Sequence, residues 1–504
     1  MGESARPFSN PLEEVFLLSL IQISNLTFSY DGSYDTIFED VSFQLDTKWK
    51  LGFCGRNGRG ETTFLKLLMG DFEYRGRISS DVTFDYFPFS VQDTEVSVLD
   101  ILFEIAPIAQ EWQIRKELSL LSVDDGVLYQ PFYTLSNGEQ TKVLLVGLFL
   151  KENNFLLIDE PTNHLDSFAR KVVADYLKGK SGFILVSHDR AFLDECTDHT
   201  LSINKTDIEV VKGNFSNWWE QKGRQDAFEM AQNIKLGKDI KRLKQASKRT
   251  ANWSDEIEAS KIGSGGDKGY IGAQAARMMK RSKATQQRGD KAIEEKEKLL
   301  KNIEKKEDLK IHPLDYHALQ LLRLSNVGVR YDKRDIFYGL DLTVNRGDRL
   351  ALVGGNGTGK SSILKLLCGE LAPRLGTVQI GSGLIISYIP QDATFLTGKL
   401  SDFAVDSDID LTLFKTILRK LDFSRNQFEK DMSSYSAGQK KKVLLAKSLS
   451  EKAHLYVWDE PLNYIDVLSR MQIEELLLAY QPTMIFVEHD VIFVENVANK
   501  MIEL

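Results

Sequence analysis

The sequence is poor in cysteine and in long apolar runs. Its 504 residues include three cysteines, Cys54, Cys196 and Cys368, which lie far apart and form no C-x-x-C pair. This spacing argues against a disulfide framework and a zinc site, and it favours a reducing, cytoplasmic location. The longest apolar runs, such as residues 143–150 and 15–21, are much shorter than the roughly 20 residues that a membrane helix needs.

The N-terminal segment lacks the features of a secretory signal. Its first 17 residues carry Glu3, Glu13 and Glu14 against a single Arg6, and no small-residue cleavage signal follows. We therefore expect residues 1–19 to be an extension outside the first folded domain.

Acidic residues outnumber basic residues over the whole chain, but not in every segment of it. The chain has 64 Lys and Arg against 72 Asp and Glu, a net charge of −8, which by itself argues against a nucleic-acid partner. Residues 221–310, however, contain 23 Lys and Arg and 14 Asp and Glu. The acidic total conceals a basic insert, which is compatible with a solvated spacer or with a phosphate-rich partner.

Four segments of the first half recur in the same order, at a nearly constant spacing, in the second half. At 42% hydrophobic residues the chain is long enough for two or more folded domains. The chain is thus a duplicated module. The matching pairs are the glycine-rich stretches 52–63 and 353–362, Ser136 and Ser436, Glu160 and Glu460, and His188 and His489.

Each copy begins with an apolar run, a glycine-rich turn and a helical pattern, the order that a phosphate-binding loop requires. Other short apolar runs bounded by polar residues predict buried parallel strands. The fold class is therefore α/β, with two phosphate-loop domains. The predicted strands span 50–53, 155–158, 183–186 and 349–353, and the predicted helices span 63–68 and 362–367.

Between the copies the composition predicts an all-α helical hairpin. Residues 221–249 and 277–310 contain no proline and are rich in Ala, Lys, Glu and Leu, whereas 254–272 contain five glycines that favour a turn. Arms of roughly 30 residues would each reach about 45 Å. The expected domains are the extension 1–19, a first domain 20–220, a basic linker 221–318 and a second domain 319–504.

The second glycine-rich loop matches the phosphate-binding consensus in full. Its glycines let backbone N–H groups face phosphates, and the following helix adds a favourable dipole. Lys360 is expected to reach the outer phosphates of a nucleotide, and Ser361 to bind Mg²⁺. The expected binding residues are Gly354, Asn356, Gly357, Gly359, Lys360, Ser361 and Ser362, with Gly55, Asn57, Gly58, Gly60, Glu61, Thr62 and Thr63 in the first loop.

A carboxylate pair ends an apolar run in each copy. An isolated Asp-Glu is usually a solvated strand end, but its recurrence before proline favours a role on Mg²⁺ for the aspartate and on the attacking water for the glutamate. A histidine beyond the next strand is expected to sense the terminal phosphate. The expected catalytic residues are Glu160, Glu460, His188 and His489, and the expected metal ligands are Thr62, Asp159, Ser361 and Asp459.

Further motifs resemble ATP-binding cassette proteins. Ser-Asn-Gly-Glu-Gln at 136–140 and Ser-Ala-Gly-Gln-Lys at 436–440 look like the signature motif of that family. The resemblance implies that Tyr30 and Tyr331 stack on adenine and that Gln391 serves at the Mg²⁺ and water position. It also implies two head-to-tail sites, each joining the glycine-rich loop of one cassette to the signature of the other. The signature residues so implied are Ser136, Gly138, Glu139, Ser436, Gly438 and Gln439.

Two cassettes, a charged helical linker and no membrane segment resemble the F subfamily, ABC-F, whose members act on the ribosome. Residues 213–216, 271–283 and 458–466 resemble its antibiotic-resistance branch, especially the Lsa-type ribosome protection proteins. The resemblance implies ATP hydrolysis with Mg²⁺ by a monomer that pairs its own cassettes. It also implies binding at the ribosomal exit site, against large-subunit rRNA and peptidyl-site tRNA. The linker would displace lincosamides, streptogramins A and pleuromutilins from the peptidyl-transferase centre.

The basic arms suit RNA by their own chemistry, because Lys and Arg contact phosphate without reading sequence. Tyr270, near the expected turn, is placed either to stack on a base or to pack within the hairpin. The expected RNA contacts are Lys241, Arg242, Lys244, Lys248, Arg249, Tyr270, Arg277, Lys280, Arg281 and Lys283.

The first glycine-rich loop departs from the consensus. Glu61 stands where the phosphate-binding lysine belongs, and Phe89 stands where the first site would have its glutamine. A negative charge there repels phosphate, so we expect the first site to bind MgATP poorly.

Three alternatives differ from ribosome protection. A housekeeping ABC-F translation factor would share every catalytic residue and differ at the linker tip. The ATPase subunit of a drug exporter would have no evident use for a basic hairpin. A DNA-repair cassette protein would be expected to carry zinc-binding cysteines, which three scattered thiols cannot supply.

Overall fold

The computed structural model describes residues 19–30, 36–56, 59–163, 165–204, 207–259, 309–331 and 334–504, with Arg277, Lys280, Ala284, Arg288 and Lys291 as isolated positions. Asn57, Gly58, Tyr270, Arg281 and Lys283, all named above, lie outside these residues, as does nearly all of the 1–19 extension.

The chain forms two compact units. One combines residues up to Ser216 with those from position 307 onward, and the other spans positions 217–306. Leu309 and Ile311 pack into the core of the second α/β domain. The domain limits expected from the sequence stay a prediction.

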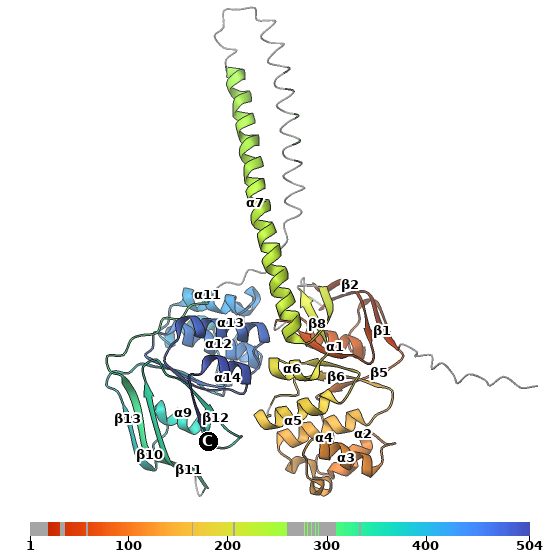
Figure 1. Ribbon diagram of the computed structural model, residues 1–504, viewed down its shortest axis with the longest axis vertical. Coiled ribbons are helices and arrows are strands. Elements are labelled where there is room, and N and C mark those ends of the chain that lie inside the picture. Colours follow the sequence, from red (N-terminus) through yellow and green to blue (C-terminus); the bar gives the residue numbers. More distant parts are fainter. Residues whose placement is uncertain are drawn as a thin grey trace, which may run out of the picture. The chain divides into compact units, whose positions relative to one another are not determined.

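The first α/β domain has a six-stranded and a three-stranded sheet (Figure 1). The larger has the order β5-β6-β7-β3-β8-β9, parallel except for the β8–β9 pair. Its strands are β3 (Lys50–Cys54), β5 (Thr83–Phe87), β6 (Asn154–Asp159), β7 (Phe183–Val186), β8 (His199–Asn204) and β9 (Asp207–Lys212). The smaller is antiparallel and consists of β2 (Thr36–Asp46), β1 (Leu20–Ser29) and β4 (Arg75–Ser79).

Helices surround these sheets and join the strands. α1 follows the glycine-rich loop, and α4 begins at the signature motif with a Ser136–Glu139 capping box. The helices are α1 (Glu61–Met69), α2 (Val98–Ile105), α3 (Glu111–Leu120), α4 (Asn137–Phe149), α5 (Ser167–Lys178) and α6 (Arg190–Cys196). Short 3₁₀ turns, η1 (Asp125–Tyr129) and η2 (Phe132–Thr134), lead into α4.

The second α/β domain repeats this architecture. Its antiparallel sheet is β11 (Arg334–Asn345), β10 (Gln320–Tyr331) and β13 (Leu375–Ile380). Its parallel sheet is β14 (Ile386–Ile389), β15 (Leu455–Asp459), β16 (Met484–Val487), β12 (Arg349–Val353) and β17 (Lys500–Glu503). The helices are α9 (Lys360–Leu367), α10 (Leu400–Asp406), α11 (Leu411–Lys420), α12 (Ala437–Ser450), α13 (Val467–Tyr480) and α14 (Val491–Val497), with 3₁₀ turns η3 (Arg425–Glu429) and η4 (Met432–Ser434).

The predicted α/β fold class is confirmed. The predicted strands 183–186 and 349–353 coincide with β7 and β12, and the other two lie within a residue of β3 and β6. These strands are buried along their length, which is why an uninterrupted apolar run marks them. The antiparallel sheets were not foreseen, because their strands alternate buried and exposed residues.

The linker unit begins with the long helix α7 (Phe215–Ala259). The helix starts before the predicted 221 and continues past 249, so the expected turn at 254–272 is wrong at its start. Residues 250–259 contain neither Gly nor Pro to stop the helix, which explains the extension. The isolated described positions from Arg277 to Lys291 are also helical.

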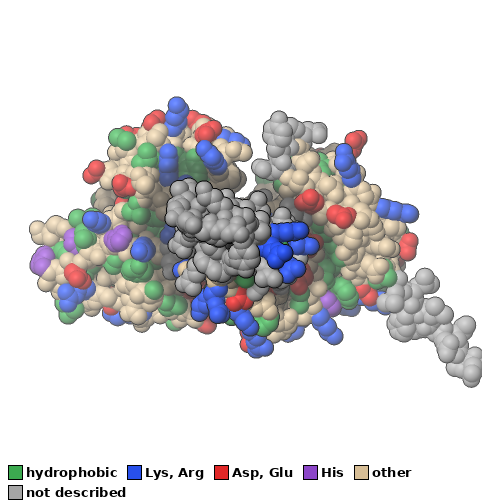
Figure 2. All heavy atoms as spheres, turned by 90° about the horizontal axis from the view of Figure 1, so that it is seen from above, with side chains coloured by type: hydrophobic (Ala, Val, Ile, Leu, Met, Phe, Trp, Pro, Cys, Tyr) green, Lys and Arg blue, Asp and Glu red, His purple; other side chains and the backbone are tan. Residues whose placement is uncertain are grey.

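Charge is mixed over the surface that Figure 2 shows, where basic and acidic side chains are interspersed on the α/β domains. Across the described parts of the chain, no helix is both long enough and apolar enough to span a membrane.

Trp458 in β15 tests the packing of the second core. It is fully buried and donates from Nε1 to Ser448 Oγ at 2.9 Å. Trp458→Ala should lower the free energy of unfolding by about 3–5 kcal/mol, because it removes a large apolar side chain and leaves a cavity. The matched control, Trp112→Ala, alters a tryptophan that is 60% exposed and should change stability little in the same denaturant titration. Equal losses would contradict this account of the core.

Candidate functional site

The second glycine-rich loop joins β12 to α9 through three left-handed glycines. Gly354, Gly357 and Gly359 have φ angles of 148°, 80° and 102°, which other residues rarely adopt. A Cβ at Gly354 would lie 2.8 Å from the carbonyl oxygen of Leu504. Lys360 Nζ donates to the carbonyls of Gly354 and Gly355 at 2.8 and 2.7 Å, so its ammonium group lies across the loop.

Asp459 ends β15 next to this loop. It is 1% exposed, and in the described part of the chain neither of its carboxylate oxygens has a hydrogen-bond partner; nor does the hydroxyl of Tyr388. Burial raises the pKa of Asp459 to about 6. Buried carboxylate oxygens without protein partners beside a serine hydroxyl are the ligands that Mg²⁺ prefers, so the residues present fit that ion.

Glu460 follows Asp459 and is held in a fixed orientation. Its Oε2 accepts from Asn463 Nδ2 at 2.6 Å, and its Oε1 lies 3.4 Å from His489 Nε2. Burial alone would raise its pKa, but the hydrogen bond and charge of His489 outweigh burial and lower the pKa to about 2. Glu460 is therefore ionised at neutral pH and able to accept a proton.

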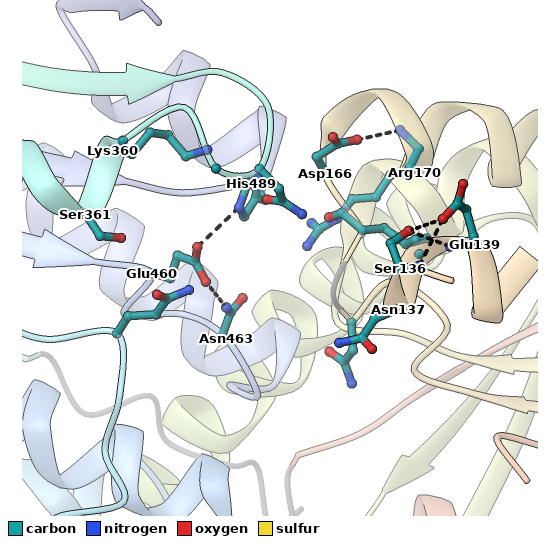
Figure 3. A pocket seen from close by; sticks show the side chains of 18 of the residues that line it. Ser136, Asn137, Glu139, Asp166, Arg170, Lys360, Ser361, Glu460, Asn463 and His489 are labelled. Atoms are coloured by element: carbon teal, nitrogen blue, oxygen red, sulfur yellow. Dashed lines mark hydrogen bonds and ion pairs between the residues drawn. The ribbon is translucent and has the colours of Figure 1, made fainter. Parts of the chain in front are cut away.

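Lys360, Glu460 and His489 line a cavity of about 790 Å³ to which both α/β domains contribute (Figure 3). On one side lie Lys360, Ser361, Gln391, Glu460 and His489. On the opposite side lies the N-terminus of α4, with Ser136, Asn137, Gly138 and Glu139. Ser136 and Glu139 cap that helix reciprocally, which leaves its N-terminus well defined and directed at the cavity. Of the other residues predicted for this site, Asn356, Gly357, Gly359, Ser362 and Tyr331 also line the cavity, Gly354 and Asp459 are not among its lining residues, and Asn137 was not predicted.

Several residues of the cavity wall were not foreseen. The side chain of Asp166 caps α5 by accepting from Ala169 N at 2.9 Å. Burial lowers the pKa of Lys360 in the other cassette, and the charge of Asp166 acts in the opposite direction. Arg170 donates to the Leu165 carbonyl and pairs with Asp189 at 3.0 Å. The signal was available for Asp166, because both copies carry an aspartate six residues after the catalytic glutamate. The others on the wall are Lys142, Asn163, Asn463 and Tyr464.

The first centre has the same arrangement of strand, loop and helix as the second, but several of its side chains differ. Glu61 begins α1 and is 9% exposed, and burial with the charges of Glu160 and Asp159 raises its pKa well above the ordinary glutamate value. Asp159 accepts from Thr62 Oγ1 at 2.9 Å and from the Tyr86 hydroxyl at 2.8 Å. The protein itself therefore satisfies one oxygen, Oδ2, of the carboxylate that matches Asp459.

Glu160 and His188 also differ from their counterparts. Their closest atoms, Oε1 and Nε2, are 3.5 Å apart. Burial, with the charge of Asp159, raises the pKa of Glu160 to about 8, and burial lowers the pKa of His188 to about 3. At neutral pH this pair is mostly uncharged. The cavity here is about 340 Å³, with Ser436, Gly438 and Gln439 on its far side.

Tyr30 and Tyr331 hold matching positions beside the two loops. The Tyr30 hydroxyl is 2.6 Å from Thr63 Oγ1, and that of Tyr331 is 3.2 Å from Ser362 Oγ. Both rings are 43% exposed and so remain open to a flat ligand, but their stacking on adenine stays a prediction.

The expected RNA contacts divide into three groups. Lys241, Arg242, Lys244, Arg277 and Lys280 are helical and exposed. Lys248 and Arg249 lie within α7, and Tyr270, Arg281 and Lys283 lie outside the described residues.

Comparison with known proteins supports this geometry. Residues 38–163 and 337–463, together half of the sequence, match the ABC transporter family. The chain belongs to that family. Its two α/β domains are therefore two ATP-binding cassettes, for which ATP hydrolysis is the general activity.

Two curated relatives match nearly the whole chain. The ribosome protection protein VmlR of Bacillus subtilis is 27% identical over 95% of this chain and 86% of its own length. The ATP-binding protein Uup of Buchnera aphidicola is 27% identical over 96% of this chain and 80% of its own length. A solved structure of the archaeal ribosome recycling factor aABCE1 with stalk protein aP1 shares the fold. Its TM-score is 0.62 at 18% identity, over 95% of this chain and 87% of that one.

The two glutamates should contribute unequally to hydrolysis. Glu460→Gln removes an ionised base and should slow ATP turnover by about 10²–10⁴-fold. Glu160→Gln replaces a group that is mostly protonated at neutral pH and should change turnover by less than about twofold. Steady-state phosphate release measures both, and equal losses would contradict the assignment.

Glu61 should make stability depend on pH. Because its pKa is raised in the folded chain, folding favours the protonated form, and stability falls as the pH rises above the ordinary value of 4.5. Gln cannot titrate, so Glu61→Gln should gain melting temperature relative to the unaltered chain as the pH increases from there. Glu73→Gln, at an exposed glutamate, serves as the control. If the melting-temperature difference between Glu61→Gln and the unaltered chain stayed constant over this pH range, the raised pKa of Glu61 would be refuted.

Proposed function

We propose that this protein is an ABC-F ATPase that acts on the ribosome in the cytoplasm and protects it from antibiotics of the peptidyl-transferase centre. The observation that carries the proposal is the second centre, where a complete phosphate loop, an unsatisfied Asp459 and an ionised Glu460 face the signature helix of the other cassette.

In this centre ATP would bind with its phosphates on the loop between Gly354 and Ser361. Lys360 would exchange its two carbonyl contacts for the outer phosphates, and Ser361, Asp459 and Gln391 would hold Mg²⁺. When bound, Mg²⁺ neutralises charge on the phosphates. Glu460 would take the proton of a water that attacks the terminal phosphorus, while the bond to the ADP oxygen breaks. His489 keeps Glu460 oriented, and the α4 N-terminus at Ser136 would bind the terminal phosphate only when the cassettes close.

The first centre would bind MgATP poorly. At an effective dielectric near 20, one unit pair at 4 Å is worth about 4 kcal/mol, and Glu61 reverses its sign relative to lysine. Such a change rivals the roughly 8 kcal/mol of a micromolar affinity. The internally bonded Asp159 adds to this, because Thr62 and Tyr86 both donate to its Oδ2.

Ribosome binding is supported by the basic linker and by the relatives. The exposed Lys241, Arg242 and Lys244 suit the phosphates of rRNA and of peptidyl-site tRNA at the exit site. VmlR is named a ribosome protection protein and matches 95% of this chain. The linker, proposed at 221–318, would serve as the antibiotic-resistance domain against lincosamides, streptogramins A and pleuromutilins.

A housekeeping ABC-F translation factor is the second candidate. It is favoured by the equal identity to Uup, whose name records ATP binding alone. Both candidates use the same two centres and differ in whether the linker displaces a drug.

Translation by purified ribosomes stalled with a lincosamide or a pleuromutilin separates the two. The Glu61→Lys variant of the protein should bind a second nucleotide per chain and should restore peptide synthesis in the presence of the drug. Glu460→Gln in the same background should stay on the ribosome during co-sedimentation. Ribosome binding without rescue would favour the housekeeping factor, and no binding would refute both.

A further inference from the structure

The cassette contacts differ between the two centres. In the first centre, Arg56 Nη1 and Arg59 Nη2 of the glycine-rich loop each lie 3.8 Å from Oδ2 of Asp422, in the turn between α11 and η3 of the other cassette. The three side chains are 18–30% exposed, so solvent screens this contact only in part. A phosphate loop of one cassette is thus joined to the signature region of the other by the protein's own charges.

The second centre cannot make this contact. Gly355 and Thr358 occupy the places of Arg56 and Arg59, and Ser122 occupies the place of Asp422. Ser122 and Asp422 share a left-handed backbone, with φ angles of 53° and 67°, so the turn is the same and only the charge differs.

A second one-sided contact is buried between the cassettes. Arg190 Nη2 in α6 lies 2.5 Å from Glu474 Oε2 in α13, with 8% and 9% of the side chains exposed. Asn496 donates to the other oxygen of Glu474 at 2.6 Å. The matching positions are Val491 and Ala174, which carry no charge. Because this pair is buried and Glu474 also accepts from Asn496, solvent screens it less than it would an exposed pair.

The interior of the first centre is consistent with a closed contact. The cavity lined by Glu160, His188 and the opposite signature motif is about 340 Å³, against about 790 Å³ at the second centre, and Glu61 at the start of α1 is itself buried. Closure there needs no bridging phosphate, whereas the second centre has a wide cavity and, among the residues that the structure describes, no ion pair between its loop and the opposite turn.

We propose that the first centre is a standing hinge, held without nucleotide by the Arg56–Asp422, Arg59–Asp422 and Arg190–Glu474 ion pairs, and that only the second centre opens and closes with ATP. Arg56, Arg59 and Asp422 are positioning residues rather than catalytic ones. The inference rests on the proposed ATP-driven closure of the second centre.

Distances between spin labels test the hinge in the full chain. Label pairs at Asp71 and Arg425 span the first centre, and the matching pair at Glu370 and Asp125 spans the second; all four positions are exposed. Cys54 and Cys196 are buried, so Cys368 is the native thiol to replace by Ala. Without nucleotide, the first pair should give one narrow distance distribution and the second a broad one. MgATP in the Glu460→Gln background should shorten only the second.

Charge variants separate the hinge from a folding effect. Asp422→Arg should broaden the first-centre distribution, and combining it with Arg56→Asp and Arg59→Asp should restore it. The matched control Asp408→Arg, an exposed acidic residue outside these contacts, should leave it unchanged.

The outcomes of these measurements are distinct. A broad first-centre distribution without nucleotide in the unaltered chain, or an ATP-driven change there as large as at the second, would overturn the hinge. A narrow first-centre distribution with a second centre that ignores ATP would support the contact and count against the proposed function instead.

Discussion

The two halves of this duplicated protein differ in the charge of the side chain that begins the helix after each glycine-rich loop. In each copy a glycine-rich loop turns a buried parallel strand into a helix, and the first side chain of that helix lies against the loop. Lys360 directs an ammonium group across its loop, whereas Glu61 places a carboxyl group among other acids. A cation there makes the loop a receptor for phosphate, and an acid there makes it a poor one. The glutamate and the histidine that follow also differ between the two centres.

Nearly identical motifs also take opposite protonation states, for reasons that lie in their own surroundings. Both centres carry Asp-Glu after a strand and a histidine after the next, yet the pKa of Glu160 is raised to about 8 and that of Glu460 is lowered to about 2. Burial acts on both glutamates. At the second centre His489 offsets it, while at the first burial and the charge of Arg470 lower the pKa of His188 to about 3. A motif thus identifies which groups meet, and their surroundings decide which of them can accept a proton.

The parts of the fold that were predictable are those that short-range pattern determines. Uninterrupted apolar runs identify β3, β6, β7 and β12, and the glycine-rich loops identify the turns that precede α1 and α9. The antiparallel sheets were not predicted, because each of their strands exposes one face and so has no uninterrupted apolar run. Asp166 and Arg170 were not predicted for another reason. They line the second centre from the other cassette, and the spacing of motifs within one copy does not show which residues of the other copy lie opposite. The length of α7 was underestimated because no Gly or Pro lies between Gly237 and Gly263.

Duplication gives two centres the same backbone and leaves the side chains free to diverge. The left-handed turns at Ser122 and Asp422 show this, since their geometry is shared and only one carries a charge. Arg190 and Glu474 have likewise no charged counterparts at Val491 and Ala174. Two centres that both closed on nucleotide would each need a phosphate to join the cassettes. In the proposed hinge, arginine and aspartate join the cassettes at the first centre without phosphate, so Glu61 in place of the expected lysine would weaken nucleotide binding there but not the contact. The chain can therefore carry Glu61 in the first centre and retain the groups proposed for hydrolysis in the second.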